Sequence, residues 1–353
     1  MERRQGKRKK APLIIALSLV SFLVLYFAGG IIAHNVVANV IFDKRGSDET
    51  SLSSKWYSVF NAQKDYETLQ NRDIFSFSSI NKEKLTGYFY SNPNPKGTVI
   101  SLHGMGSLSD GDNAEFQDWF VKKGYNLAAI DLTASGRSEG ASMRGLHQSA
   151  YDAKEAYSYL LKEGKIVPPL IMVGHSWGGF GAAASISLGV KADYVISFSA
   201  FDMPLNYMYD CAAIRVGPLA PITYPGFLLG IKMRFGENAN LSASKALKDS
   251  NVKALLVHGE DDITVRYSES LLYAAKDFPN VTPFLIPDCG HDRPWLSLEA
   301  KQYAQESIAK VGEGFDRLNG EEAELALKEI GHDKNKASVL SADLFSSIET
   351  FLA

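Results

Sequence analysis

From about residue 73 to the C-terminus, short apolar runs alternate with longer amphipathic segments. Runs rich in Val, Ile, Leu and Phe and bounded by Gly, Pro or Asp are typical of buried strands. They predict eight strands, at residues 74–79, 85–91, 97–103, 125–131, 169–175, 192–200, 252–258 and 281–287. The segments between and after them predict helices at 113–123, 146–162, 177–188, 268–278 and 340–352. The first two strands alternate apolar and polar residues, which indicates an antiparallel hairpin, whereas the later ones are almost wholly apolar, as in a parallel sheet covered on both faces. The pattern predicts an α/β fold.

Two segments interrupt this alternation and are interpreted as insertions. Residues 201–243 form an apolar stretch punctuated by prolines, which we expect to be a lid over the carboxyl edge of the sheet. Its Met203, Tyr207 and Tyr209 are candidate substrate-binding residues, although a structural loop with its own small core is the alternative. Residues 294–336, with helical patterns at 298–310 and 321–330, are expected at the edge of the domain and show no recognisable chemistry.

The N-terminus has a different pattern. Residues 1–10 carry six Lys or Arg and one Glu, and residues 11–42 contain no charged residue. A spanning helix needs about 20 apolar residues, so length favours a transmembrane signal-anchor at 11–33, followed by a juxtamembrane stalk at 34–72 and the α/β domain at 73–353. A cleaved signal peptide is the alternative, since small residues at 28–30 and 36–38 suit a signal peptidase. The positive-inside rule predicts an extracytoplasmic domain on the cell membrane, or a secreted one after cleavage.

Composition narrows the possible partners and cofactors. The 353 residues, 45% hydrophobic and 22% charged, are typical of a globular protein. Because the first ten residues contribute +5 to a net charge of −3, the remainder carries about −8, which argues against nucleic acid. The two cysteines, Cys211 and Cys289, form no metal or redox motif, although a single bridge is possible in an exported chain. No metal-binding motif or dinucleotide fingerprint appears, so no cofactor is predicted.

The sequence Gly174-His175-Ser176-Trp177-Gly178 directly follows an apolar run. A Gly-x-Ser-x-Gly pattern between a buried strand and a helix is typical of a nucleophile elbow, a sharp turn that presents the serine hydroxyl above the sheet. Gly174 and Gly178 are expected to prevent a Cβ clash where strand and helix come close. By itself the pattern is equally compatible with a small-residue packing turn.

A serine nucleophile needs an imidazole base and a carboxylate that orients it. Asp261 and Asp262 follow the run at 254–259, and His291 follows the run at 284–287. In parallel sheets such residues gather at the carboxyl ends of the strands. Neighbouring strand-end residues point in different directions, so only one of the two aspartates is expected to face His291. The chain order is serine, aspartate, histidine.

From about residue 74 onward the chain resembles the α/β-hydrolase superfamily. Four motifs occur in the family's order: His103-Gly104-Met105-Gly106, Asp131 with Gly136-Arg137-Ser138, the elbow at Ser176, and Gly259-Glu260-Asp261-Asp262 with Gly290-His291. The resemblance implies an eight-stranded hydrolase fold with Ser176, Asp262 and His291 as the triad. It implies an oxyanion hole formed by the backbone N–H groups of Trp177 and Met105, with His103 stabilising that loop. Residues 133–136 depart from the family pattern, which affects only the role of their loop.

The resemblance implies acyl transfer through an acyl-enzyme, and the apolar insertion favours carboxylic esters with an acyl or aryl group, delivered as small or lipid-like molecules near the membrane. A serine aminopeptidase of the same fold is the alternative. It requires a carboxylate for the substrate amine, for which Asp202, Asp210 and Glu237 are candidates. A catalytically inactive binding module is a third possibility. The sequence does not indicate an oligomeric state.

Overall fold

The computed structural model describes residues 2–42, 44–46, 53–109, 111–217 and 220–353. These residues form two compact units, which we describe separately. One comprises Met1–Ile41 and Leu205–Asn240, and the other comprises Phe42–Pro204 and Leu241–Ala353. Residues 47–52 of the predicted stalk and residues 218–219 of the predicted lid lie outside the described residues.

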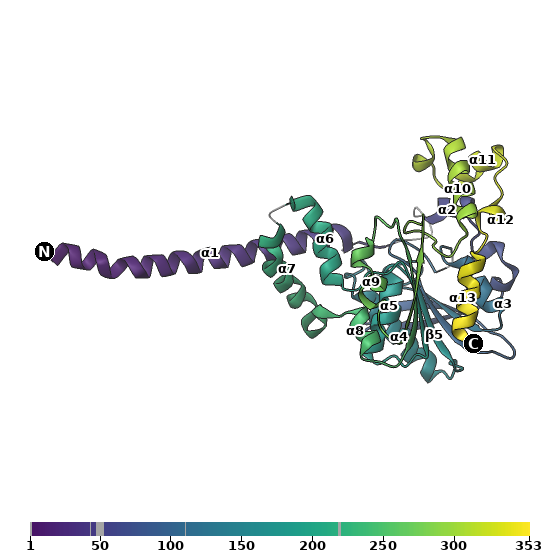
Figure 1. The fold of residues 1–353 in the computed structure, drawn as a ribbon, viewed down its shortest axis with the longest axis horizontal. Coiled ribbons are helices and arrows are strands. Elements are labelled where there is room, and N and C mark those ends of the chain that lie inside the picture. The colour runs from purple at the N-terminus through teal and green to yellow at the C-terminus, as the bar shows by residue number, and fades with distance from the viewer. Residues whose placement is uncertain (1, 43, 47–52, 110, 218–219) are drawn as a thin grey trace. The chain divides into compact units, whose positions relative to one another are not determined.

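The larger unit is built on one eight-stranded sheet (Figure 1). Its strands are β1 (Asp73–Ser78), β2 (Lys84–Tyr90), β3 (Thr98–Leu102), β4 (Asn126–Asp131), β5 (Leu170–His175), β6 (Tyr194–Phe198), β7 (Lys253–Gly259) and β8 (Val281–Ile286). All eight predicted strands are confirmed. Their order is β1-β2-β4-β3-β5-β6-β7-β8. β2 pairs antiparallel with β1, as predicted, and also with β4, whereas the pairs from β3 to β8 are parallel.

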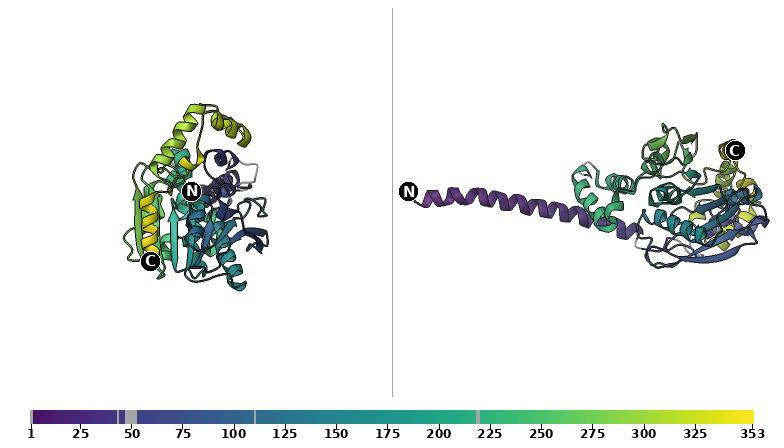
Figure 2. Two further views of the ribbon diagram at one scale, coloured as in Figure 1. Left: turned by 90° about the vertical axis from the view of Figure 1, so that its right-hand side faces the viewer. Right: turned by 90° about the horizontal axis from the view of Figure 1, so that it is seen from below.

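Helices cover both faces of this sheet (Figures 1 and 2). One face carries α3 (Ala114–Lys122) and α13 (Ala342–Leu352), and the other carries α4 (Gln148–Lys162), α5 (Trp177–Ala184), α8 (Ala243–Lys248) and α9 (Leu271–Ala275). Phe116 and Phe120 of α3 and Leu344 of α13 are fully buried in the core. The five predicted crossover helices are present, but α9 is shorter than its predicted range because Ser270 caps its N-terminus.

A second small core lies at one end of the domain. It brings together α2 (Ser53–Val59), α10 (Leu298–Val311), α11 (Gly320–Glu329) and α12 (Lys334–Ala337). Val59 is fully buried there against Phe315 and Leu327. The Asn61 N–H donates to Ser338 Oγ at 2.8 Å, which ties the end of the same segment to the C-terminal region. This part of the predicted stalk therefore packs within the larger unit.

Residues 44–46, also within the predicted stalk, bind the domain through hydrogen bonds. Arg45 donates to the carbonyl oxygens of Gly136 at 2.8 Å and of Ser138 at 3.1 Å. The Gly46 N–H donates to the Ala134 carbonyl at 2.8 Å. The loop after β4, where the sequence departs from the family pattern, thus holds the chain segment that follows the N-terminal helix.

The smaller unit consists of α1 (Glu2–Phe42), α6 (Pro204–Val216) and α7 (Ala220–Phe235), followed by a 3₁₀ turn (Gly236–Asn240). Residues Pro12–Val36 of α1 are long and apolar enough to cross a membrane, although a signal sequence passes the same test. The insertion predicted at 201–243 is a pair of helices rather than an irregular loop.

Candidate active site

Ser176 lies at the turn between β5 and α5. Its backbone has φ 53° and ψ −114°, a strained conformation for a residue with a side chain. A Cβ on Gly174 would collide with the backbone of Gly178, and a Cβ on Gly178 would lie 2.6 Å from the His103 carbonyl oxygen. These contacts confirm why glycine is needed on both sides of the serine. The resulting turn has the geometry of a nucleophile elbow.

The structure brings Ser176, His291 and Asp262 into one hydrogen-bonded chain. Ser176 Oγ lies 3.0 Å from His291 Nε2, and His291 Nδ1 lies 2.7 Å from Asp262 Oδ2. With a neutral imidazole, Nδ1–H donates to the carboxylate and Nε2 accepts the serine proton. The Asp262 side chain is fully buried. Its other oxygen accepts the backbone N–H groups of Thr264 and Val265 at 2.8 Å each. The carboxylate is therefore fixed in position.

Asp261, the rival candidate acid, is exposed, and its N–H donates to the Cys289 carbonyl at 3.0 Å. It therefore joins the end of β7 to the loop that carries His291. The structure thus assigns the two aspartates different contacts, with only Asp262 bonded to the imidazole.

Two further histidines contact the residues of this hydrogen-bonded triad. His175 Nε2 donates to the His291 carbonyl at 3.0 Å, and burial, together with the adjacent His291, lowers the pKa of His175 to about 4. His258 Nε2 donates to the Val265 carbonyl at 2.9 Å and lies 3.5 Å from Asp262 Oδ2. Burial lowers the pKa of His258 as well. The sequence analysis assigned His258 no role, but its position near the end of β7, four residues before Asp262, was an available signal.

The two expected oxyanion residues come from different elements, α5 and the loop after β3. Trp177 begins α5, where the first backbone N–H groups have no acceptor within the helix. Its indole N–H donates to the Leu146 carbonyl at 2.8 Å, which fixes the start of the helix. Met105 lies in the loop after β3. His103 holds this loop, because its Nδ1 donates to the Gly104 carbonyl at 2.7 Å and its Nε2 accepts the Leu132 N–H at 3.1 Å. The predicted stabilising role of His103 is confirmed.

A cavity of about 320 Å³ adjoins the site and shares Met105 and His175 with it. Its apolar wall includes Trp56 of α2 and Ile308 of α10. Both helices come from segments to which sequence reasoning gave no chemistry: the predicted stalk and the 294–336 insertion. Apolar residues such as Trp56 and Phe60 in an otherwise polar segment were the available signal.

A buried charge cluster forms one side of this cavity. Arg293 donates to Glu115 Oε1 at 2.5 Å and to the Asp112 carbonyl at 3.1 Å. Burial raises the pKa of Glu115 to about 7. From α10, Lys301 Nζ contacts Cys289 Sγ at 3.0 Å. Since Cys289 and Arg293 each lie two residues from His291, these contacts fix both sides of its loop.

The residues expected to bind substrate lie in α6 or directly before it. Met203 precedes α6, while Tyr207 and Tyr209 belong to α6 in the smaller unit. The Tyr209 ring packs against Tyr224 and Phe227, with centroids at 4.8 and 6.3 Å. A substrate role for these three residues stays a prediction.

Of the predicted amine-binding carboxylates, Asp202 accepts hydrogen bonds from Ser242 Oγ at 2.9 Å and from the Ser244 N–H at 2.7 Å. It therefore holds the start of α8. Asp210 and Glu237 belong to the smaller unit.

His175, His291 and Asp292 offer ligand atoms within 4.8 Å of one another. Both imidazole nitrogens of His291, however, are engaged by Ser176 and Asp262. A cation at this position would therefore compete with the hydrogen-bonded chain.

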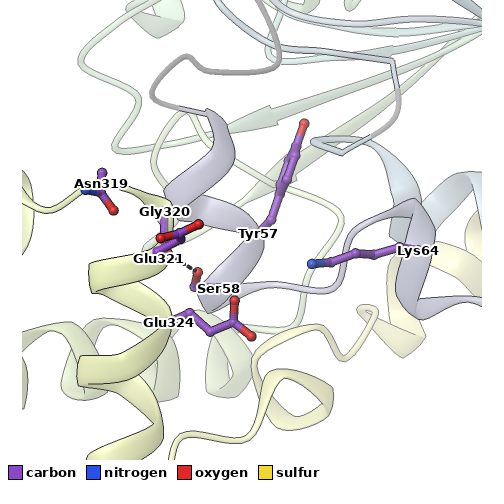
Figure 3. Close-up of a pocket in the computed structure, with 7 residues that line it drawn as sticks. All are labelled: Tyr57, Ser58, Lys64, Asn319, Gly320, Glu321 and Glu324. Carbon is purple, nitrogen blue, oxygen red and sulfur yellow. Dashed lines mark hydrogen bonds between the residues drawn. The ribbon is translucent and has the colours of Figure 1, made fainter.

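Figure 3 shows a second recess, between α2 and the start of α11, with Ser58, Lys64, Glu321 and Glu324 among its lining residues. The Ser58 hydroxyl donates to the Gly320 carbonyl at 3.1 Å. No histidine is present among the described lining residues, so this serine has no base there.

Comparisons with known proteins are consistent with this geometry. A family model described as serine aminopeptidase, S33, matches residues 93–221. Multifunctional-autoprocessing repeats-in-toxin proteins match over about 35% of this chain, with 30% identity in Vibrio cholerae and 28% in Vibrio vulnificus. The matched part spans only 3% of each toxin. An esterase of Pyrococcus furiosus shares the fold at a TM-score of 0.50 and 20% identity, with 70% of this chain and 91% of the esterase covered.

One known fold accounts for all of these features: the sheet order, the elbow after β5, the acid after β7 and the histidine after β8. The larger unit therefore has the α/β-hydrolase fold, and its match to a serine aminopeptidase family model lies within this fold.

Proposed function

We propose that this chain is a serine hydrolase that cleaves carboxylic esters with an apolar acyl or aryl group. The observation that carries the proposal is the hydrogen-bonded chain from Ser176 Oγ through His291 to Asp262, with distances of 3.0 and 2.7 Å. These are the distances needed for proton transfer from the nucleophile to its base. The buried carboxylate stabilises the imidazolium that forms.

In the proposed reaction, Ser176 Oγ attacks the substrate carbonyl while His291 Nε2 takes the hydroxyl proton. The N–H groups of Trp177 and Met105 stabilise the tetrahedral oxyanion. Its collapse expels the alcohol, which receives the proton from His291 and leaves an acyl-enzyme on Ser176. Water then attacks the acyl-enzyme with His291 as base, which releases the acid and restores the serine.

The cavity beside Met105 supports an apolar substrate group. Trp56, Phe60, Trp295 and Ile308 line it, and pockets for small molecules are mostly apolar with a few polar groups. Filling it with Ile308→Phe is expected to lower kcat/KM for long-chain esters more than for acetate esters. Leu325→Phe, on the exposed side of α11, is the matched control.

The direct experiment labels the full-length protein with a fluorophosphonate probe and compares it with Ser176→Ala. We expect labelling to be lost in the variant, together with at least about a 10³-fold loss of p-nitrophenyl ester turnover. Failure of the correctly folded wild type to react with the probe would overturn the proposal and favour a catalytically inactive binding module.

A serine aminopeptidase is the second candidate, favoured by the family match and by the position of Asp292. Its carboxylate lies within 4.8 Å of imidazole nitrogens of His175 and His291 and lines the same cavity, where it would hold a substrate amine. Turnover of an aminoacyl p-nitroanilide above that of esters would establish this activity. Asp292→Asn should then weaken anilide turnover and leave ester turnover unchanged.

We further propose that α1 spans the cell membrane as an uncleaved signal-anchor, with the hydrolase domain on the extracytoplasmic side. The six basic residues before its apolar span support this orientation. A protease added to cells would test this orientation. We expect it to digest the domain once the cell wall or outer membrane has been removed, while the cell membrane is still intact.

A further inference from the structure

The smaller unit contains a helix pair with unusually close backbones. A Cβ on Gly30 of α1 would lie 2.5 Å from Gly226 Cα of α7, and a Cβ on Gly230 would lie 2.7 Å from His34 Cδ2. Gly226 and Gly230 are four residues apart and therefore share one face of α7. Two small residues at this spacing let helix backbones approach closely, as is common in membrane helix pairs.

Aromatic packing extends this contact to α6. The fully buried His34 ring meets the ring of Phe227 of α7 edge-on, with centroids at 4.9 Å. Tyr209 of α6 packs against the same phenylalanine. Among the residues that the structure describes, neither His34 nitrogen has a hydrogen-bond partner.

The face of α7 next to these glycines is apolar and exposed. Its exposed residues include Pro221, Pro225, Leu229 and Met233 at a regular spacing of four, with 38% exposure at Leu229 and 69% at Met233. A helix that faces water normally carries polar residues on that side. The basic residues Lys232 and Arg234 lie in its last turn, where long side chains can reach lipid headgroups while their stems stay in an apolar layer.

A surface groove joins this face to α1. It measures about 470 Å³ and is lined by Val20, Leu23, Val24, Phe27, Ala28 and Ile31 of α1 and by Leu229 of α7. All seven side chains are apolar, and the groove is continuous with the exposed apolar span Pro12–Val36. The acyl chain of a lipid would fit this groove. Both are apolar, and the groove adjoins the span that lipid would surround.

The position of a residue along α1 determines its depth in the bilayer. Counted from Pro12, about 20 residues cross the hydrocarbon layer and end near Ile31. Gly30 and His34 therefore lie where the span meets the headgroups. We propose that α7 is an interfacial membrane helix. It docks on α1 through Gly226 and Gly230 and buries Leu229 and Met233 in the leaflet opposite the basic N-terminus. The proposal rests on α1 spanning the bilayer and is independent of the hydrolase activity.

The test uses the full-length protein with Cys211→Ser, reconstituted in phosphatidylcholine and phosphatidylglycerol vesicles. Single cysteines at Leu229, Met233, Val24 and Leu161 are labelled with an environment-sensitive fluorophore, and quenching by lipids spin-labelled at defined depths is measured. The buried Cys289 is not expected to label. We expect deep quenching at Val24, shallow quenching with a blue-shifted emission at Leu229 and Met233, and neither effect at the exposed Leu161 of α4.

Gly30→Leu should remove the quenching at Leu229 and Met233 and preserve it at Val24. Gly29→Leu is the matched control, since nothing lies within 4 Å of a Cβ there, and it should change neither. Water-like emission at Leu229 and Met233 in the parent protein would overturn the proposal, as would an unquenched Val24 label. Persistence of the shallow quenching in Gly30→Leu would refute docking through the glycines. Fluorophosphonate labelling of each variant separates these outcomes from any failure of the hydrolase proposal.

Discussion

Asp262 and Asp261 are adjacent in sequence, yet only the side chain of Asp262 is buried against His291. Its two oxygens accept hydrogen bonds from the imidazole and from two backbone N–H groups. This arrangement fixes the tautomer in which Nε2 faces the serine. The exposed Asp261 contributes a backbone hydrogen bond instead.

Replacing Asp262 with asparagine should therefore lower kcat by about 10⁴-fold, because the amide stabilises the wrong imidazole tautomer and no imidazolium. Ester turnover measures the loss, and circular dichroism checks the fold. Asp261→Asn keeps the backbone bond and should retain nearly full activity. Equal losses in the two variants would contradict the assignment of the acid.

The buried His175 should make stability depend on pH. Its folded pKa of about 4 lies below its ordinary value of 6.5, so the unfolded chain binds the proton more readily between these values. The free energy of unfolding should consequently fall as the pH drops from 6.5 to about 4. In His175→Gln, which keeps a donor for the His291 carbonyl, this part of the fall should disappear. Denaturant titrations across the pH range measure it, and an unchanged slope would contradict the account.

For single residues, the sequence predicted the three members of the hydrogen-bonded triad. Each follows a recognisable apolar run, and the carboxyl ends of parallel strands lie at one edge of the sheet. The sequence did not predict the support from His258 or the Glu115–Arg293 pair. The Glu115–Arg293 pair joins residues 178 positions apart, and a local pattern contains no signal for such a contact. His258 lies only four residues from Asp262, but the pattern of the strand does not show which way its side chain points.

Among the elements, β7 and the loop carrying His291 are held close by a glycine. A Cβ on Gly259 would collide with the Cys289 carbonyl and lie 2.6 Å from that of Gly290. Gly259→Ala should therefore push the loop away from Asp262. We expect a loss of kcat larger than the loss of stability can explain, measured by turnover and thermal unfolding.

Gly290→Ala is the control on the same loop, because nothing lies within 4 Å of its Cβ and its φ is not positive. It should retain activity. If the two alanine variants behave alike, close packing at Gly259 does not position the loop.

The strands were predictable because buried parallel strands are continuous apolar runs, which leave little ambiguity. The helices of the second small core were not. α2 has only seven residues, and its buried Val59 gains a partner in Phe315 and Leu327, more than 250 positions further along the chain. Short helices of this kind owe their stability to such packing rather than to their own sequence.

In the molecule as a whole, the sequence predicted an apolar N-terminal helix, an insertion and a hydrolase domain. It did not predict the pairing of α1 with α7, since the glycines that allow it are separated by almost 200 residues. It also placed the candidate substrate-binding residues in the first insertion and did not predict the cavity beside Met105, which is lined by residues of α2 and α10.

The position of β8 at the edge of the sheet has a consequence for how the protein loses activity. β8 has hydrogen-bonded neighbours on one side only, has only one buried residue, and leads directly into the loop of His291. Edge elements with few buried contacts open at lower free energies than central ones. Opening of β8 would separate the base from a serine that β5 still holds in the centre of the sheet.

Inactivation by denaturant should therefore precede global unfolding. We expect ester turnover to fall at a lower urea concentration than the far-ultraviolet circular dichroism, with full recovery on dilution. Coincident transitions would show instead that the edge strand and the centre of the sheet unfold as one cooperative unit.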